Sequence, residues 1–277
     1  MKILCLDGGG VFGKIQSTII SQAGCLDKFD CFVGTSIGAA QSVAFAAGMG
    51  DKVKPSFFDE WMPEVFKASW LRKINIFTSK YPDTGLNKAL VSVFDAVKFG
   101  TMKKPVFVTA ANIWQKTLKV FSSNDFDDGQ WAAWEIARAA TAAETYFPSW
   151  KGYADGGVFA NNPSMVGLAA AVRVLGIKLS DIEVFSIGTG DSSGVQGFSP
   201  KTRPSWGVWL IEALLNGAAN KMHEYFVLSL VSQMKKYERH QFIREPDWKM
   251  DDPSCMDKAE KAWAVEIQRA IDGLKSF

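Results

Sequence analysis

The fold is decided by residues 29–47, which read FDCFVGTSIGAAQSVAFAA. The apolar residues 29–33 predict a buried strand, and the small residues 37–47 predict a helix that packs close to it. Between them lies Gly34-Thr35-Ser36-Ile37-Gly38. This stretch matches G-x-S-x-G, the sharp strand-to-helix turn that exposes a serine hydroxyl. We therefore predict Ser36 as a nucleophile, placed at the positive end of the helix dipole.

A second match to the same pattern occurs at Gly190-Asp191-Ser192-Ser193-Gly194. Two matches in one chain show that the pattern alone is weak, so the surrounding sequence must decide between them. The residues after Ser192 include glycine, serine and proline and indicate a loop instead of a helix. We therefore expect Ser192 to be a chance match.

A glycine-rich turn, Asp7-Gly8-Gly9-Gly10-Val11-Phe12-Gly13, follows a predicted strand at residues 2–6 and opens a helix. Backbone N–H groups at such a helix start can converge on an anion. The turn satisfies the dinucleotide pattern G-x-G-x-x-G, and it equally suits an oxyanion hole or a simple tight turn. The dinucleotide interpretation lacks the acidic residue expected after the second strand, and Asp7 would repel a pyrophosphate.

The rest of the chain alternates short apolar runs with helical patterns, which predicts an α/β fold with a mainly parallel sheet wrapped by helices. Between residues 53 and 83, prolines interrupt aromatic-rich pieces, and we expect an insertion or cap that serves either a bilayer interface or a subsidiary core. The part from about 205 to 277 has helical spacing, and we predict one domain over residues 1–277. Further strands are expected at 105–110, 117–122 and 182–187, and further helices at 132–143 and 163–175.

Composition limits the class of partner. The 277 residues carry a formal net charge of +2, which argues against nucleic acid as a partner. The four cysteines form no Cys-x-x-Cys pair, which favours reduced thiols over zinc or disulfides. The uncharged residues 31–50 could span a bilayer by length, but their glycines and polar residues favour a buried strand, turn and helix. We expect a cytoplasmic protein without a signal peptide, which contacts membranes only peripherally.

A serine nucleophile needs a base, and the chain holds only two histidines, His223 and His240. Either could complete the Ser…Asp…His order of an α/β-hydrolase, although both lie in surroundings typical of surface residues. The competing base is Asp155, in Asp155-Gly156-Gly157. The reference pKa of aspartate lies about 2.6 units below that of histidine, or roughly 3.5 kcal/mol. A Ser36–Asp155 dyad therefore needs a closed, partly dry pocket.

Four blocks, taken in this order, resemble the patatin-like phospholipases. They are Asp7-Gly8-Gly9-Gly10, Gly34-Thr35-Ser36-Ile37-Gly38, Ala137-Arg138-Ala139-Ala140-Thr141-Ala142-Ala143-Glu144-Thr145-Tyr146-Phe147-Pro148 and Asp155-Gly156-Gly157-Val158-Phe159-Ala160-Asn161-Asn162-Pro163. The resemblance spans roughly residues 1–192 and implies a three-layer α/β/α fold. It also implies a Ser36–Asp155 catalytic dyad, and an oxyanion hole formed by Gly8, Gly9 and Gly10.

Two residues depart from the family pattern. Phe12 stands two positions after the third glycine, where the family usually has a basic residue, and Lys14 follows two residues later. The role of that cation in shaping the oxyanion loop therefore cannot be assigned to position 12. Glu144 stands where proline is usual. Its carboxylate could be exposed and without effect, which we favour, or it could lie near the site and alter the charge preference for the substrate.

The resemblance implies hydrolysis of a membrane phospholipid or another acyl-ester lipid through an acyl-enzyme, with no metal and no organic cofactor. One alternative is an esterase with a Ser-Asp-His triad. Another is a regulated nucleotide-binding module built on the glycine loop, which leaves the serine turn and the Asp155 block unexplained.

Overall fold

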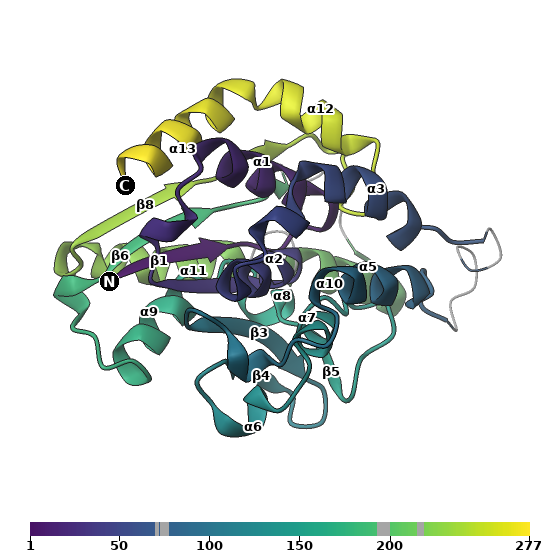
Figure 1. The fold of residues 1–277 in the computed structure, drawn as a ribbon. Coiled ribbons are helices and arrows are strands. Elements are labelled where there is room, and N and C mark those ends of the chain that lie inside the picture. Colours follow the sequence, from purple (N-terminus) through teal and green to yellow (C-terminus); the bar gives the residue numbers. More distant parts are fainter. Residues whose placement is uncertain (70–71, 73–77, 193–199, 215–218) are drawn as a thin grey trace.

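A seven-stranded sheet forms the centre of the computed structural model, which describes residues 1–69, 72, 78–192, 200–214 and 219–277 (Figure 1). The strand order is β4-β3-β2-β1-β6-β8, and β5 also pairs with β3. Strands β1, β2, β3, β6 and β8 are parallel, whereas β4 and β5 run antiparallel to β3. A separate parallel pair joins β7 and β9. The strands are β1 (Lys2–Leu6), β2 (Cys31–Thr35), β3 (Val106–Asn112), β4 (Thr117–Ser122), β5 (Tyr153–Asp155), β6 (Glu183–Ile187), β7 (Asp191–Ser192), β8 (Lys236–His240) and β9 (Ile243–Arg244).

Helices cover both faces of the sheet, because successive side chains of a strand point to opposite faces. Leu4 and Leu6 of β1 belong to a core with α1, α2 and α13, whereas Ile3 and Cys5 pack with α9. Figure 1 shows α1 and α13 above the sheet and α9 below it. This three-layer α/β/α arrangement confirms the predicted fold class. The helices are α1 (Gly13–Ala23), α2 (Ile37–Ala47), α3 (Pro55–Val65), α5 (Thr84–Phe94), α6 (Phe126–Gly129), α7 (Ala133–Ala140), α8 (Gly157–Ala160), α9 (Ser164–Arg173), α10 (Arg203–Ala213), α11 (Ala219–Leu230), α12 (Cys255–Ala262) and α13 (Ala264–Ser276).

The proline-rich segment from 53 to 83 contains a regular helix, α3, where the sequence pattern indicated only broken pieces. Pro55 begins this helix, at a position where the missing N–H has no intrahelical acceptor, and Pro63 lies in its last turn. Phe58 is fully buried, and Phe57 and Trp61 pack against the same core. The described aromatic residues of α3 therefore fill a core, while residues 70–71 and 73–77 lie outside the described residues.

The C-terminal part contains two strands in addition to the expected helices. Strand β8 extends the sheet in parallel beside β6, with Ile187 opposite His240. Its sequence, KYERH, has no continuous apolar run, so the helical spacing around it concealed the strand. The central sheet therefore includes residues far beyond the motif-bearing first 192.

The order of the strands places the candidate motifs together at the carboxyl ends of the parallel strands. From β1 the chain adds β2 and β3 on one side, and later returns to add β6 on the other side. The carboxyl ends of strands beside such a reversal are where α/β proteins bind ligands. The glycine loop follows β1 and the serine turn follows β2, so both meet at this crevice.

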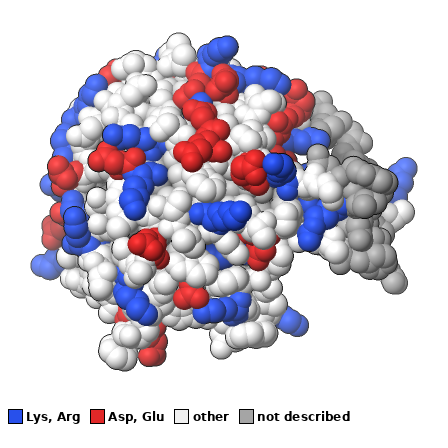
Figure 2. Space-filling view, turned by 45° about the vertical axis from the view of Figure 1, so that its right-hand side comes forward, with Lys and Arg blue, Asp and Glu red and all other residues white. Residues whose placement is uncertain are grey.

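The surface carries charges of both signs, with Lys and Arg interspersed among Asp and Glu on the face drawn in Figure 2. The uncharged residues 31–50 form β2 and α2, which are largely buried, as the sequence indicated. Among the residues that the structure describes, no helix is both long enough and apolar enough to cross a bilayer.

Candidate active site

Ser36 occupies a strained turn between β2 and α2. Its φ of 53° and ψ of −126° are values that residues with a side chain rarely adopt. The flanking glycines leave no room for side chains, since a Cβ on Gly34 would lie 2.2 Å from the Gly38 carbonyl oxygen. A Cβ on Gly38 would lie 2.3 Å from the carbonyl oxygen of Leu6. The structure therefore places Ser36 in the strand-to-helix turn that the motif predicts.

The glycine loop lies directly beside this turn, because β1 and β2 are neighbours in the sheet. A Cβ on Gly8 would lie 2.9 Å from Ser36 Cβ, and Gly10 has a φ of 58° that favours glycine. Gly9 and Gly10 line the cavity that contains Ser36. The Gly8 N–H instead donates a hydrogen bond to the Asn161 carbonyl oxygen at 3.2 Å. The loop thus presents two of the three predicted glycines to the cavity, while the third holds the loop in place.

Asp155 ends β5 beside Ser36 and is only 1% exposed. Its Oδ1 accepts a hydrogen bond from the Gly157 N–H at 2.8 Å, and its own N–H donates to Ala142 O at 3.0 Å. Burial raises the pKa of Asp155 from 3.8 to about 6, while hydrogen bonds from Ser36 and Gly157 act in the opposite direction. The structure therefore brings the Ser36 side chain next to the Asp155 carboxyl group in a desolvated place.

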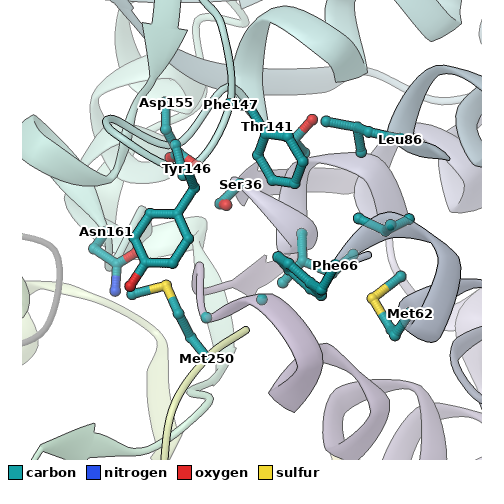
Figure 3. Close-up of a pocket in the computed structure, with 15 residues that line it drawn as sticks. Ser36, Met62, Phe66, Leu86, Thr141, Tyr146, Phe147, Asp155, Asn161 and Met250 are labelled. Atoms are coloured by element: carbon teal, nitrogen blue, oxygen red, sulfur yellow. The ribbon is translucent and has the colours of Figure 1, made fainter. Parts of the chain in front are cut away.

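The two residues lie in a cavity of about 60 Å³ (Figure 3). In Figure 3, Asp155 and Asn161 lie on one side of Ser36, and Met62 and Leu86 lie on the other. Asp155 is the one charged side chain among the described residues that line this cavity. The other lining residues are mostly apolar: Ile37, Met62, Val65, Phe66, Leu86, Ala143, Tyr146, Phe147 and Met250. The apolar, partly desolvated surroundings that a Ser–Asp pair requires are thus present, although the cavity is not fully closed.

Neither histidine lies at this cavity. His223 on α11 bonds through Nε2 to the Phe159 carbonyl oxygen at 3.0 Å, and burial lowers its pKa. His240 on β8 bonds through Nε2 to Glu238 Oε1 at 2.9 Å. Ser192 belongs to β7, which pairs with β9, and so it does not occupy a strand-to-helix turn like that of Ser36.

Comparison with known proteins agrees with this geometry. A family model described as patatin-like phospholipase matches residues 4–168. The chain belongs to the patatin-like phospholipase family. The four sequence blocks that resemble this family lie together around the cavity, which confirms the resemblance.

Curated relatives in this family are identical to the chain at about a quarter of the aligned positions. The cGAMP-activated phospholipase of Pseudomonas aeruginosa is 28% identical over 205 residues, covering 68% of this chain and 62% of the relative. The cGAMP-activated phospholipase of Vibrio cholerae is 25% identical over 285 residues, covering 88% of this chain and 77% of the relative. The chain thus spans less than two thirds of the length of several curated relatives. The crystal structure of VipD from Legionella pneumophila covers 98% of this chain and 66% of its own, with a TM-score of 0.50 at 11% identity, which shows the shared fold.

The patatin-like loop of this chain has no cation at position 12. Phe12 is buried and packs against the rings of Trp248 and Trp263. Lys14 points to acidic side chains outside the loop, with Nζ 2.8 Å from Asp59 and 3.0 Å from Asp257. Position 12 therefore contributes packing, and Lys14 joins α1 to neighbouring helices.

Arg239 on β8 supplies a cation to the loop, and motif reasoning missed it. Its side chain is almost fully buried and forms a bidentate ion pair with Asp7, the first residue of the loop. Its Nη1 also donates to Ser186 Oγ at 2.6 Å. Burial raises the pKa of Asp7 to about 6, while the Arg239 charge acts to lower it. Arg239 lies outside residues 4–168, so no family motif pointed to it.

The Glu144 side chain is half-buried, so the expectation that its carboxylate is exposed is wrong. Its Oε2 is buried and has no hydrogen-bond partner among the described residues. Burial and the nearby charge of Asp155 raise the pKa of Glu144 to about 8. In place of the family's proline, the chain therefore carries a second carboxyl group next to Asp155. At pH 7 this second group, on Glu144, is mostly protonated.

Proposed function

We propose that this protein is a lipid acyl hydrolase, of the phospholipase A type or less specific, with Ser36 as nucleophile and Asp155 as base. The observation that carries the proposal is the position of the Ser36 side chain beside the buried Asp155 carboxyl group at an apolar cavity. Membership of the patatin-like phospholipase family and the phospholipase names of two relatives support an acyl-ester lipid as substrate.

The proposed reaction proceeds through an acyl-enzyme. Asp155 takes the proton of Ser36 as Oγ attacks the ester carbonyl carbon, and the N–H groups of Gly9 and Gly10 stabilise the oxyanion. Asp155 then gives this proton to the leaving alcohol as the tetrahedral intermediate collapses. Asp155 next takes a proton from a water molecule as that water attacks the acyl carbon, and it returns this proton to Ser36 Oγ as the intermediate collapses and the fatty acid leaves. These steps use no metal and no organic cofactor.

The raised pKa of Asp155 improves its action as a base. A carboxylate with a pKa of about 6 is still mainly ionised at pH 7. It nevertheless binds a proton about a hundredfold more tightly than an ordinary aspartate. Burial thus supplies most of the difference in basicity between aspartate and histidine, which is what a dyad without histidine requires.

Both alternative functions fit the site less well. A Ser-Asp-His triad would need a histidine at the cavity, but His223 and His240 bond elsewhere. A nucleotide-binding loop would have to place phosphate charge in a cavity where the one charged group among the described lining residues is the Asp155 carboxylate. The replacement of both histidines by glutamine tests the triad directly, because the dyad predicts retained esterase activity in the folded variant.

Peripheral membrane contact is part of the proposal, and we place it on α10 and α11. These helices expose large aromatic side chains, including Trp206 (48% exposed) and Tyr225 (73%), of the kind that prefer a membrane interface. The aromatic residues of α3 pack inward instead. Co-sedimentation with phosphatidylcholine vesicles should fall in Trp206→Ala/Tyr225→Ala and remain in Trp61→Ala. The reverse result would return the membrane contact to the segment at 53–83.

The nucleophile is tested with a fluorophosphonate probe and a panel of phospholipids and p-nitrophenyl esters. Labelling and hydrolysis should both disappear in Ser36→Ala. In Asp155→Asn, hydrolysis should fall by at least the ~10²-fold typical of a lost general base. Hydrolysis that survives unchanged in folded Ser36→Ala would contradict the proposal.

A further inference from the structure

A second cavity lies next to the one that contains Ser36. It has a volume of about 30 Å³ and is enclosed mainly by α2, α3 and α5. The two cavities share five lining residues, Ile37, Met62, Val65, Leu86 and Thr141. The second cavity therefore adjoins the first, and these five residues form the common wall between the two.

The walls of the second cavity are apolar. Its described lining residues carry no charge, and those that do not also line the first cavity include Phe57, Ala89, Leu90, Val93 and Phe94. The two polar side chains among the lining residues use their donors elsewhere. Gln41 Nε2 donates to Gly13 O at 3.1 Å, and Thr141 Oγ1 donates to Ala137 O at 2.8 Å. The cavity thus offers a mainly apolar environment, although Gln41 Oε1 is buried without a hydrogen-bond partner among the described residues.

The position of this cavity matches the geometry of an ester bound at Ser36. Met62 and Leu86 line both cavities and lie on the side of Ser36 opposite Asp155 (Figure 3). Asp155, as the acid for the leaving alcohol, must face the alcohol side of the ester. The acyl chain therefore extends toward Met62 and Leu86. Met62 has an unbranched, flexible side chain that can change rotamer to open the common wall.

We propose that the cavity between α2, α3 and α5 binds the acyl chain of the substrate and sets the chain length that the enzyme prefers. This inference rests on the proposed function, because it assumes an ester bound at Ser36. Each methylene group that enters the cavity should raise kcat/KM about fourfold until the chain reaches the far wall. Phe57, Leu90 and Phe94 belong to this wall. Longer chains must displace these side chains or leave the cavity.

The test fills the cavity from α5 and uses p-nitrophenyl butyrate, octanoate and palmitate with the full chain. Ala89→Leu adds three carbon atoms at a fully buried lining position. We expect the kcat/KM ratio of octanoate to butyrate to fall about tenfold, as when one to two methylene groups lose their site. Val91→Leu is the matched control, because Val91 lies on the same helix but is 41% exposed, and its ratio should equal that of the wild type. An unchanged ratio in folded Ala89→Leu would overturn the proposal.

A second variant opens the cavity and guards against misfolding of the first. Phe57 is half-buried at the cavity wall, so Phe57→Ala removes a barrier at a tolerant position. The kcat/KM ratio of palmitate to octanoate should rise severalfold. Phe126→Ala, at an exposed position on α6, should leave this ratio unchanged. A kcat/KM ratio of palmitate to octanoate in Phe57→Ala that equals the wild-type value would also contradict the assignment.

If the wild type hydrolyses none of the esters and resists the fluorophosphonate, the proposed function itself fails. If the wild type is active but its chain-length profile ignores these variants, only the acyl site fails.

Discussion

The guanidinium of Arg239 holds the carboxylate of Asp7 in two hydrogen bonds beneath the glycine loop. Nη1 lies 3.2 Å from Oδ1, and Nη2 lies 2.7 Å from Oδ2. Arg239 belongs to β8 and Asp7 follows β1, so the pair connects the late strand of the sheet to the loop beside Ser36. Both side chains are buried, so each charge depends on the other for compensation.

Removal of this arginine should destabilise the protein and slow the reaction. Arg239→Met keeps most of the side-chain volume but leaves Asp7 buried without its partner. We expect the free energy of unfolding to fall by about 3–5 kcal/mol, the usual loss when one member of a buried pair is removed. We also expect kcat to fall more than KM rises, because in the proposed mechanism the loop acts on the transition state. Urea unfolding and steady-state kinetics measure the two effects.

The double variant Asp7→Asn/Arg239→Met separates charge compensation from positioning of the loop. It removes both charges, so much of the lost stability should return. Its kcat should remain low, because the bidentate contact that orients the loop is still absent. A wild-type kcat in this variant would show that Arg239 only neutralises Asp7.

The sequence predicts the central strands and the serine turn well, because these elements carry strong local signals. The apolar run before Ser36 and the small residues after it determine β2 and α2 with few alternatives. Strand β8 lacks such a signal, since its charged residues are matched by partners that are distant in the sequence or on the same strand. Arg239 pairs with Asp7, and Lys236 pairs with Glu238. Only the folded sheet shows why charged residues are tolerated there.

The candidate site likewise combines residues that the sequence reveals with residues that only the folded structure explains. Ser36, Asp155 and the glycine loop belong to motifs, and the structure brings them together as expected. The environment of Glu144 depends instead on the path of the loop between α7 and β5, where the Asp155 N–H bonds to Ala142 O. A one-residue departure from a motif does not reveal whether its carboxyl group faces solvent or a second carboxyl group.

Asp155 should be a source of instability at neutral pH. Its pKa is about 6 in the folded state against 3.8 in the unfolded chain, so the folded state binds the proton more tightly. The stability contributed by this proton is present below pH 4 and is lost as the pH rises through 6. At about 1.4 kcal/mol for each pKa unit, Asp155→Asn should be more stable than the wild type by about 3 kcal/mol at pH 7.5. The two proteins should unfold alike near pH 4; a constant difference across this range would contradict the assigned pKa.

The pH profile of kcat/KM should show both carboxyl groups. Asp155 must be ionised to act as a base, so kcat/KM should fall tenfold for each pH unit well below 6. Above a pH of about 8, Glu144 becomes ionised in a buried place without a hydrogen-bond partner among the described residues, which should loosen the loop that holds Asp155 and lower kcat/KM. Glu144→Gln should keep the acidic limb and the rate at pH 7 but lose the alkaline decline. An alkaline decline that persists in Glu144→Gln would exclude Glu144 as its cause.

The strained backbone of Ser36 should be measurable as free energy. Ser36→Gly and Ser36→Ala both remove the hydroxyl and should both abolish hydrolysis, but only glycine relaxes a φ of 53° with a ψ of −126°. Relief of strain exceeds the added entropy of the unfolded chain, so Ser36→Gly should be more stable than Ser36→Ala by about 1 kcal/mol. Ser42, in the interior of α2, is the matched control. There, alanine should be more stable than glycine by a similar ~1 kcal/mol, because the backbone is helical. The opposite signs at the two serines, measured by urea unfolding, would locate the strain at the turn that presents Ser36, and equal signs would show that this turn is relaxed.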